Sequence, residues 1–285
     1  MFELVHAERA RFSVAFSCRV LGVSRSGYYR WARSSPSPRA QADVRLSAEV
    51  RDIHREHRGR YGSPRVHREL RARGRRLSRK RVARLMRQEG LCGRAPRRFR
   101  RTTDSRHSHR IASNLLARDF SAAAPNRAWV GDITYVPTCD GWLYLAVLID
   151  LFSRRVVGWA MSDHIDTELA LNALSAAVAR RRPGPGLIHH TDRDCRYASD
   201  DYQLALINLG MVASMSGKAD CWDNAVAESF FATLEKELLS HSSLQSRAET
   251  RRAVAEYIDR YYNDRRRHSY LDFVSPLEHE MLSKL

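Results

Sequence analysis

The chain has 285 residues and a formal net charge of +17, and this length allows more than one domain with a sizeable core. The charge is unevenly spread, because residues 1–120 hold 31 Lys and Arg against 10 Asp and Glu, whereas the remainder holds 18 against 22. This imbalance favours a polyanion-binding region joined to a separate chemical domain, although a solvated basic face would also produce it.

Cysteine usage and hydropathy exclude two further classes of protein. The five cysteines lie far apart and form no CxxC pair, which is typical of reduced residues and not of a disulfide framework. The longest apolar run, 142–149, is too short to span a bilayer, and the N-terminus lacks a signal-peptide pattern. We therefore expect a soluble, cytoplasmic protein without a membrane partner.

Residues 1–38 predict a helix-turn-helix-like segment. A helix up to position 21 would end at Gly22, and Ser24 is a natural N-cap for a second helix. The spacing alone is weak evidence, because any small helical hairpin shows it. The second helix carries the candidate DNA-binding residues Arg25, Tyr29 and Arg30.

Residues 39–92 predict a second helical DNA-binding module. Apolar residues recur at helical spacing, as at Leu46, Val50 and Ile53, and the outward positions are mostly arginine. Such a density of arginine indicates a phosphate footprint. The candidate contacts here are Arg76, Arg79, Lys80 and Arg84. Residues 93–123 lose the periodicity and are interpreted as a basic linker.

Residues 124–285 predict an α/β domain. Three strands at 129–136, 142–149 and 155–160 are separated by residues typical of turns. Helices and strands then alternate, with helices at 166–182, 200–209, 224–239 and 249–262, and strands at 187–191 and 211–215. This order favours a mixed five-stranded sheet with helices on its faces.

Three acids stand out in this domain by their setting. Asp132 lies in the middle of an apolar strand, where a charge costs several kcal/mol unless a cation pairs with it. Asp192 follows a short apolar strand, and Glu228 lies early on a helix, away from its core stripe. Converging carboxylates suit Mg²⁺ or Mn²⁺, and a pair of such ions can activate a water or a 3′-hydroxyl and stabilise the leaving oxygen of a phosphodiester. On pattern alone, surface salt bridges and helix caps would also account for these acids.

Other polar residues allow functional and structural interpretations. Asp150 is the main rival carboxylate, but its position after a strand favours a turn. His189 and His190 are either metal ligands or locally bonded, and carboxylate Mg²⁺ sites rarely recruit imidazole. The basic run at 265–268 is either a solvated face or a DNA contact, with Arg266 and Arg267 as candidates.

Several strings carry a resemblance to a known family. They include NLLARDF at 114–120, WVGDITY at 129–135, IDLFSR at 149–154, HTD at 190–192 and DNAVAESFF at 223–231. Their order and spacing closely resemble the DDE transposases of the insertion-sequence-three family, specifically the product of the second reading frame. The 35 residues between Asp192 and Glu228 match the spacing that this family shares with retroviral integrases. The resemblance covers nearly the whole chain.

The resemblance implies a ribonuclease-H-like catalytic core in which Asp132, Asp192 and Glu228 form a metal-binding catalytic triad. It implies Mg²⁺ as the cofactor, with Mn²⁺ able to substitute. The family nicks the inverted-repeat ends of its element and uses the freed 3′-hydroxyl to attack DNA. The implied partners are double-stranded DNA, further copies of the chain on that DNA, and the product of an upstream reading frame. Association with a bacterial nucleoid follows.

The sequence also departs from the family at several positions. The charged position seven after the glutamate is usually lysine and is Glu235 here, with Lys236 next to it as the candidate DNA contact. Asp194, Cys195 and Arg196 stand where Gly, Ser and Gln are more usual. Two alternatives follow, namely a catalytically inactive DNA-binding regulator derived from a transposase, and a non-specific nuclease of the same fold.

Overall fold

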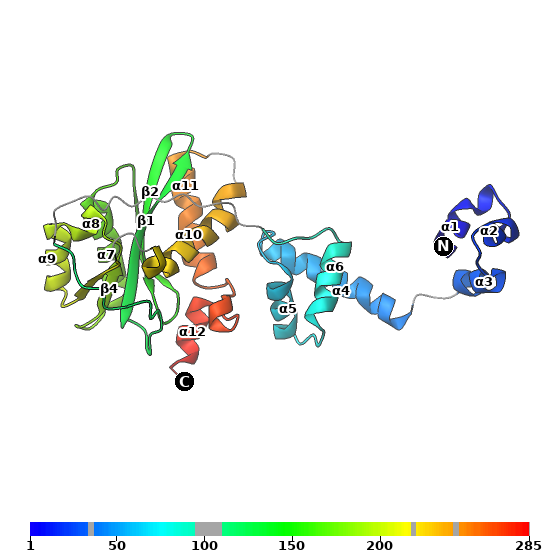
Figure 1. Ribbon diagram of the computed structural model, residues 1–285, viewed down its shortest axis with the longest axis horizontal. Coiled ribbons are helices and arrows are strands. Elements are labelled where there is room, and N and C mark those ends of the chain that lie inside the picture. The colour runs from blue at the N-terminus through cyan, green and yellow to red at the C-terminus, as the bar shows by residue number, and fades with distance from the viewer. Residues whose placement is uncertain (34–36, 95–109, 218–220, 242–244, 285) are drawn as a thin grey trace. The chain divides into compact units, whose positions relative to one another are not determined.

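The computed structural model describes residues 1–33, 37–94, 110–217, 221–241 and 245–284 (Figure 1). The chain divides into two compact units, Met1–Gly93 and Arg94–Leu285. Most of the segment expected to be a basic linker lies at 95–109, outside the described residues. None of the helices in the described ranges is long and apolar enough to cross a membrane.

The first 33 residues form three short α-helices: α1 at Phe2–Ala7, α2 at Val14–Val20 and α3 at Arg25–Arg33. The turn between α2 and α3 has the form expected from the sequence. Gly22 has a φ of 64°, which suits glycine, and the Ser24 hydroxyl accepts a hydrogen bond from the Gly27 amide at 3.2 Å. A small core of Val5, Cys18 and Tyr28 joins the helices. Helix α1 was not anticipated.

The second part of this unit contains α4 at Pro38–Glu56, α5 at Ser63–Ala72 and α6 at Arg79–Gln88. Each helix begins with a local signal: Ser37 and Ser78 cap α4 and α6 through their hydroxyl groups, and a proline opens α5. Most of the apolar positions at helical spacing are buried, although Leu46 is only half-buried. The buried ones are Val50, Ile53, Val66, Leu70, Val82, Leu85 and Met86.

A five-stranded sheet organises the second unit, with the strand order β3-β2-β1-β4-β5. Strands β1, β2 and β3 form an antiparallel meander, and β4 and β5 continue the sheet in parallel from β1. Their bounds are Ala128–Thr138, Gly141–Asp150, Val156–Ser162, Ile188–Thr191 and Val212–Met215. Each predicted strand is present within about two residues of its expected ends, so the predicted mixed sheet is confirmed.

Helices cover both faces of this sheet (Figure 1). On one face, α7 at Thr167–Arg181 and α9 at Asp200–Asn208 pack on an apolar cluster that includes Trp129 and Ile133 of β1. On the other face, α10 at Ala225–Glu237 packs on β1 and β2. The contact between α7 and β3 depends on Gly158, because a Cβ there would lie 2.4 Å from the Ala173 carbonyl oxygen.

The C-terminal region differs from its prediction. The single helix expected at 249–262 is an α-helix, α11 at Arg247–Ala255, followed by a π-helix at Glu256–Tyr262. The wider π turn carries four buried side chains, Tyr257, Ile258, Tyr261 and Tyr262. A last helix, α12 at Pro276–Leu282, was not anticipated, although Ser275 and Glu278 form the capping box that marks its start.

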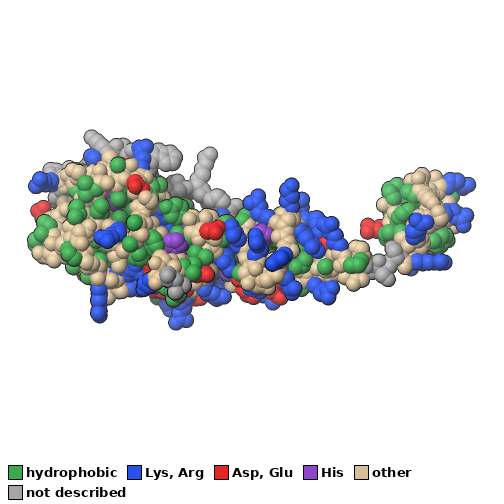
Figure 2. Space-filling view, turned by 90° about the horizontal axis from the view of Figure 1, so that it is seen from below, with side chains coloured by type: hydrophobic (Ala, Val, Ile, Leu, Met, Phe, Trp, Pro, Cys, Tyr) green, Lys and Arg blue, Asp and Glu red, His purple; other side chains and the backbone are tan. Residues whose placement is uncertain are grey.

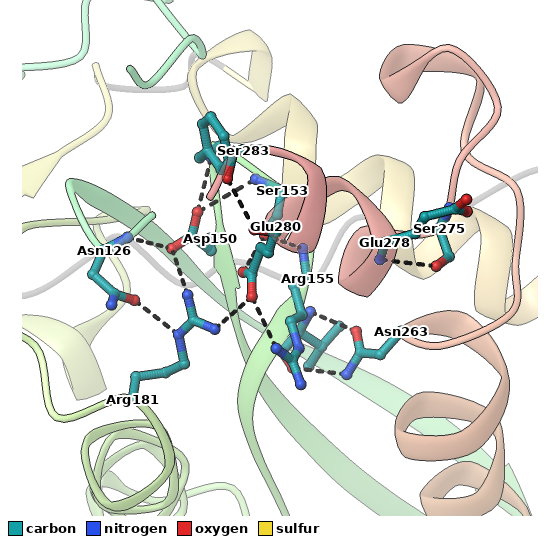
Figure 3. A network of polar contacts seen from close by, with 12 residues as sticks. Asn126, Asp150, Ser153, Arg155, Arg181, Asn263, Ser275, Glu278, Glu280 and Ser283 are labelled. Atoms are coloured by element: carbon teal, nitrogen blue, oxygen red, sulfur yellow. Dashed lines mark hydrogen bonds and ion pairs between the residues drawn. The ribbon is translucent and has the colours of Figure 1, made fainter. Parts of the chain in front are cut away.

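A buried polar network joins the end of β2 to α7 and α12 (Figure 3). The Asp150 carboxylate accepts hydrogen bonds from the Asn126 amide at 2.7 Å and the Trp129 indole at 3.2 Å. Glu280 accepts from Ser153, Arg155 and Arg181 at 2.7–2.9 Å. Asp150 Oδ1 also accepts from the Phe152 backbone amide at 2.9 Å, so the fully buried Asp150 starts the turn that the sequence favoured.

We expect Glu280→Gln to lower the free energy of unfolding by about 1–2 kcal/mol at neutral pH, because charge-assisted hydrogen bonds to two arginines are weakened. Burial acts to raise the pKa of Glu280, but the bonds from Arg181 and Ser153 outweigh it and hold the pKa below the ordinary 4.5. The depressed pKa stabilises the fold above 4.5, and this contribution is lost as the pH falls through the folded-state pKa.

Urea denaturation of Glu280→Gln and of Glu168→Gln, which changes an exposed acid on α7, would measure this effect. The Glu280 variant should differ from wild type at neutral pH and converge with it in acid. An equal loss at every pH would show that the charge of Glu280 is not what stabilises α12.

Candidate active site

Two neighbouring parallel strands bring Asp132 and Asp192 together. Strand β1 pairs with β4 in the register Val130 to His190, and continuing that register by two residues places Asp132 beside Asp192. Asp132 is half-buried in mid-strand, and its Oδ1 accepts from the Ile133 amide at 2.8 Å. Asp192 follows the last residue of β4, and its Oδ1 accepts from the Asp194 amide at 3.1 Å. Both carboxylates line one cavity of about 10 Å³.

Helix α10 brings Glu228 to the same edge of the sheet. Glu228 lies half-buried in the first turn of α10, as the sequence predicted from its position off the core stripe. The helix start is tied to β1 by Asn224, whose side-chain amide donates to the Gly131 carbonyl at 3.4 Å, one residue before Asp132. This bond fixes the beginning of α10 beside Asp132.

The charges of these acids act on one another. Burial raises the pKa of Asp132 well above its ordinary value, and the charge of Asp192 raises it further. Glu228 and Asp194 add smaller contributions of the same sign, while the bond from the Ile133 amide opposes them. A site in which one carboxylate is held against several others attracts a cation.

The residues at this cavity fit a divalent cation. Asp132 and Asp192 offer hard oxygen donors, and the Tyr197 hydroxyl in the same wall is buried with no hydrogen-bond partner among the described residues. The volume of about 10 Å³ is the room taken by one water or ion. As the side chains stand, no group of three or more His, Cys, Asp or Glu in the described ranges is arranged to hold a metal, and Glu228 does not line the cavity.

The unusual loop after Asp192 has a structural explanation. Asp194 is buried, accepts from the Arg196 amide at 3.0 Å and caps the short helix α8 at Cys195–Ala198. The Arg196 guanidinium also forms an ion pair with the Asp194 carboxylate. Asp194 and Arg196 therefore compensate each other, so that the extra acid is matched by the extra base beside it.

The two histidines before Asp192 bond locally. His189 Nε2 lies 2.7 Å from the Tyr202 hydroxyl, and His190 Nδ1 lies 2.8 Å from the Ser214 hydroxyl. Both are buried, and burial lowers the pKa of His189 to about 3, so this imidazole is neutral at physiological pH. Both histidines are therefore locally bonded. Neither lines the cavity that contains Asp132 and Asp192, which we call the acid cavity.

The structure gives Asp223 a role that the sequence did not reveal. Asp223 is buried, and its carboxylate accepts from the Asn114 side chain at 2.9 Å, the Arg118 guanidinium at 3.3 Å and the Gly217 amide at 2.7 Å. It thereby fastens the segment before the sheet to the turn that leads into α10. The only sequence signal was an acid just before a helix, which a simple cap would also explain.

Comparisons with known proteins show which family the chain belongs to. Residues 122–221 and 209–276 match two integrase core domain families, and residues 41–99 match an HTH-like domain. The chain is 42% identical over 281 residues to the transposase InsF for insertion sequence IS3A of Escherichia coli (strain K12), with 98% of each chain covered. The chain belongs to the IS3 family of transposases.

Two further likenesses concern this transposase. It is 44% identical over 259 residues to an uncharacterized 31 kDa protein of insertion element IS600 from Shigella sonnei. The match covers 91% of this chain and 95% of that protein. It is 16% identical to a chain of the simian T-cell lymphotropic virus intasome, with a TM-score of 0.47 and coverage of 81% and 74%. The strand order and the integrase core match confirm the predicted ribonuclease-H-like fold.

The candidate DNA contacts of the first unit are mostly at its surface. Arg25, Tyr29 and Arg30 are exposed on α3. Arg76, Arg79 and Lys80 are exposed around the start of α6, and Figure 2 shows many Lys and Arg side chains over the helical parts. Arg84 is instead half-buried, with its guanidinium 2.6 Å from the Asp43 carboxylate. Part of the arginine density is therefore used in ion pairs.

The candidate DNA contacts of the second unit differ in their burial and in their bonding partners. Lys236 is half-buried on α10, and Arg267 donates to the Phe273 carbonyl at 2.9 Å. Arg266 is only 4% exposed, and its guanidinium bonds the Glu237 carboxylate at 2.8–3.0 Å. The expectation that Arg266 contacts DNA is corrected, because the buried carboxylate of Glu237 occupies its donors.

Proposed function

We propose that this transposase nicks the ends of its own insertion element and joins the freed 3′-hydroxyl to DNA by metal-dependent phosphoryl transfer. The observation that carries the proposal is the pair of adjacent parallel strands that hold Asp132, in the middle of β1, and Asp192, just after β4, at one cavity, with the charge of Glu228 acting on Asp132. Such an arrangement of carboxylates has no role in packing and raises the cost of folding.

The residues have separable parts in this proposal. Asp132, Asp192 and Glu228 would hold Mg²⁺, or Mn²⁺ in its place, which when bound activates the attacking oxygen and stabilises the leaving one. The Ile133 and Asp194 amides orient the two aspartates by donating to them. Asn224 fixes the start of α10, and with it Glu228, against β1.

The partners follow from the same proposal. Double-stranded DNA, both the terminal repeats and the target, would lie against the arginine-rich helices and the acid cavity. Because two element ends are processed together, copies of the chain would assemble on DNA, with the upstream reading-frame product as a further partner. The site of action would be the nucleoid in the bacterial cytoplasm.

The deciding experiment is cleavage and strand transfer on a labelled duplex that carries the element's terminal repeat, with Mg²⁺, with Mn²⁺ and with chelator. We expect nicking at the repeat boundary and then joining, both abolished by chelator. Cutting of duplexes without the repeat, and no joining, would replace the proposal with a non-specific nuclease. Binding without cutting, also by the fusion with the upstream frame, would replace it with an inactive regulator.

A further inference from the structure

A second cavity lies beside the first turns of α10, in the same unit as the acid cavity. Its volume is about 380 Å³, within the range of small-ligand sites. Val226 and Ser229 of α10 form one wall, so the cavity shares this helix with Glu228 but shares no lining residue with the acid cavity. We call it the aromatic cavity, after its lining residues Phe120, Phe230, Tyr262 and Tyr270.

Arg154 supplies a positive charge to the wall of this cavity. The residue is only 5% exposed, and its φ of 59° is unusual for a residue with a side chain. Its Nη2 donates to the Phe120 carbonyl at 2.9 Å, whereas its Nη1 has no partner in the described part of the chain. A buried guanidinium donor without an acceptor indicates that something else supplies one.

Tyr270 is held as an exposed flat ring over this arginine. The guanidinium carbon of Arg154 lies 4.0 Å from the ring centroid, while 57% of Tyr270 remains exposed. The loop that carries Tyr270 is closed on itself, because the His268 amide donates to the Val274 carbonyl at 2.9 Å. Asp272 and Phe273 adopt φ values of 49° and 64° to complete that loop. The ring is therefore positioned before any ligand arrives.

The rim of the cavity selects against a phosphate. Asp119 lies on the rim, and its carboxylate accepts from the Ser121 hydroxyl and amide at 2.6 and 3.0 Å. These bonds keep the pKa of Asp119 below its ordinary value, so the rim carries a negative charge. A flat ligand that offers both acceptors and donors suits an aromatic platform with arginine on one side and a carboxylate on the other.

We propose that the aromatic cavity binds one unstacked nucleobase of the DNA beside the Arg154 guanidinium, with its acceptor edge toward Arg154, an amino group toward Asp119 and its ring against Tyr270. The inference rests on the DNA-processing function proposed above, and it adds a base-binding subsite on the helix that carries Glu228. A base held there would fix the DNA strand relative to the acid cavity.

The test measures DNA binding without cleavage, in chelator and in the Glu228→Gln protein. The probe is the terminal-repeat duplex with 2-aminopurine placed at one position after another. We expect one position to change fluorescence on binding. Tyr270→Phe should keep that signal, and Tyr270→Ala should lose it and bind about tenfold more weakly, as loss of the aromatic contact to one base implies. Trp142→Ala, which removes a 50% exposed aromatic on β2, is the matched control.

An unchanged affinity and signal in Tyr270→Ala would overturn the subsite, and so would a loss that Trp142→Ala reproduces. Circular dichroism melting checks that Tyr270→Ala is folded, which the exposure of the side chain leads us to expect. Cleavage by the wild type with Mg²⁺ is read separately. If the wild type cleaves and Tyr270→Ala does not change DNA binding, only the base-binding subsite is refuted. If the 2-aminopurine signal appears at one position but the wild type does not cleave, only the transposition chemistry is refuted.

Discussion

Asp132→Asn is expected to abolish metal-dependent cleavage, with a loss on the order of 10³-fold or more, while DNA binding is retained. The substitution keeps the size of the side chain and its bond from the Ile133 amide. It removes the carboxylate charge that interacts with Asp192. Asp192→Asn and Glu228→Gln should give losses of similar size. The labelled terminal-repeat duplex with Mg²⁺ is the assay.

The same substitution should stabilise the metal-free protein, with a rise in Tm of about 2–4 °C. Burial and the charge of Asp192 raise the folded-state pKa of Asp132 well above 3.8, so as the pH rises above 3.8 the unfolded chain releases this proton more readily than the fold does, and the fold loses stability up to the folded-state pKa. The advantage of Asp132→Asn should therefore grow from acid to neutral pH. Mg²⁺ should raise the Tm of the wild type and leave that of the variant unchanged.

Asp201→Asn is the control for both measurements, because Asp201 is an exposed acid in the first turn of α9. It should leave cleavage, the Tm and the response to Mg²⁺ as in the wild type. Full cleavage by Asp132→Asn would remove this residue from the site, and a lower Tm than wild type would contradict the repulsion between the two aspartates.

The parts of the fold that the sequence predicted are those with local causes. Strands β1 to β3 follow from alternation and from turn residues, and Asp132 stands out because a charge in an apolar strand needs an explanation. The register that places Asp132 beside Asp192 needs the pairing of β1 with β4, which spans about 60 positions and leaves no local signal.

The errors come from interactions over long sequence separations. A basic run at 265–268 has the composition of a DNA contact, yet the partner of Arg266 is Glu237, 29 positions earlier on α10. Likewise, two of the three partners of Asp223, Asn114 and Arg118, lie 109 and 105 positions before it, so the local sequence does not show that Asp223 holds two distant segments together instead of capping a helix. Hydrophobic periodicity indicates which face of an element is buried. It does not indicate which partner a buried polar group bonds there.

Arg266→Ala is expected to lower the free energy of unfolding by about 3–5 kcal/mol, because it leaves the Glu237 carboxylate as an uncompensated buried charge. Glu237 is 1% exposed and also accepts from the Tyr257 hydroxyl at 2.9 Å in the π-helix. Glu237 therefore joins the end of α10 to the π-helix through Tyr257 and to the segment after it through Arg266, and the loss of the ion pair should loosen the helix that carries Glu228. Denaturant unfolding measures the change.

The double change Glu237→Gln with Arg266→Met should recover much of that stability, since no buried charge is left unpaired. Arg265→Ala is the control, because this neighbouring arginine is exposed. If Arg266→Ala unfolded like the wild type and bound DNA more weakly, Arg266 would be a DNA contact after all. If the double variant were as unstable as Arg266→Ala, the pair would matter for its packing and not for the compensation of its charges.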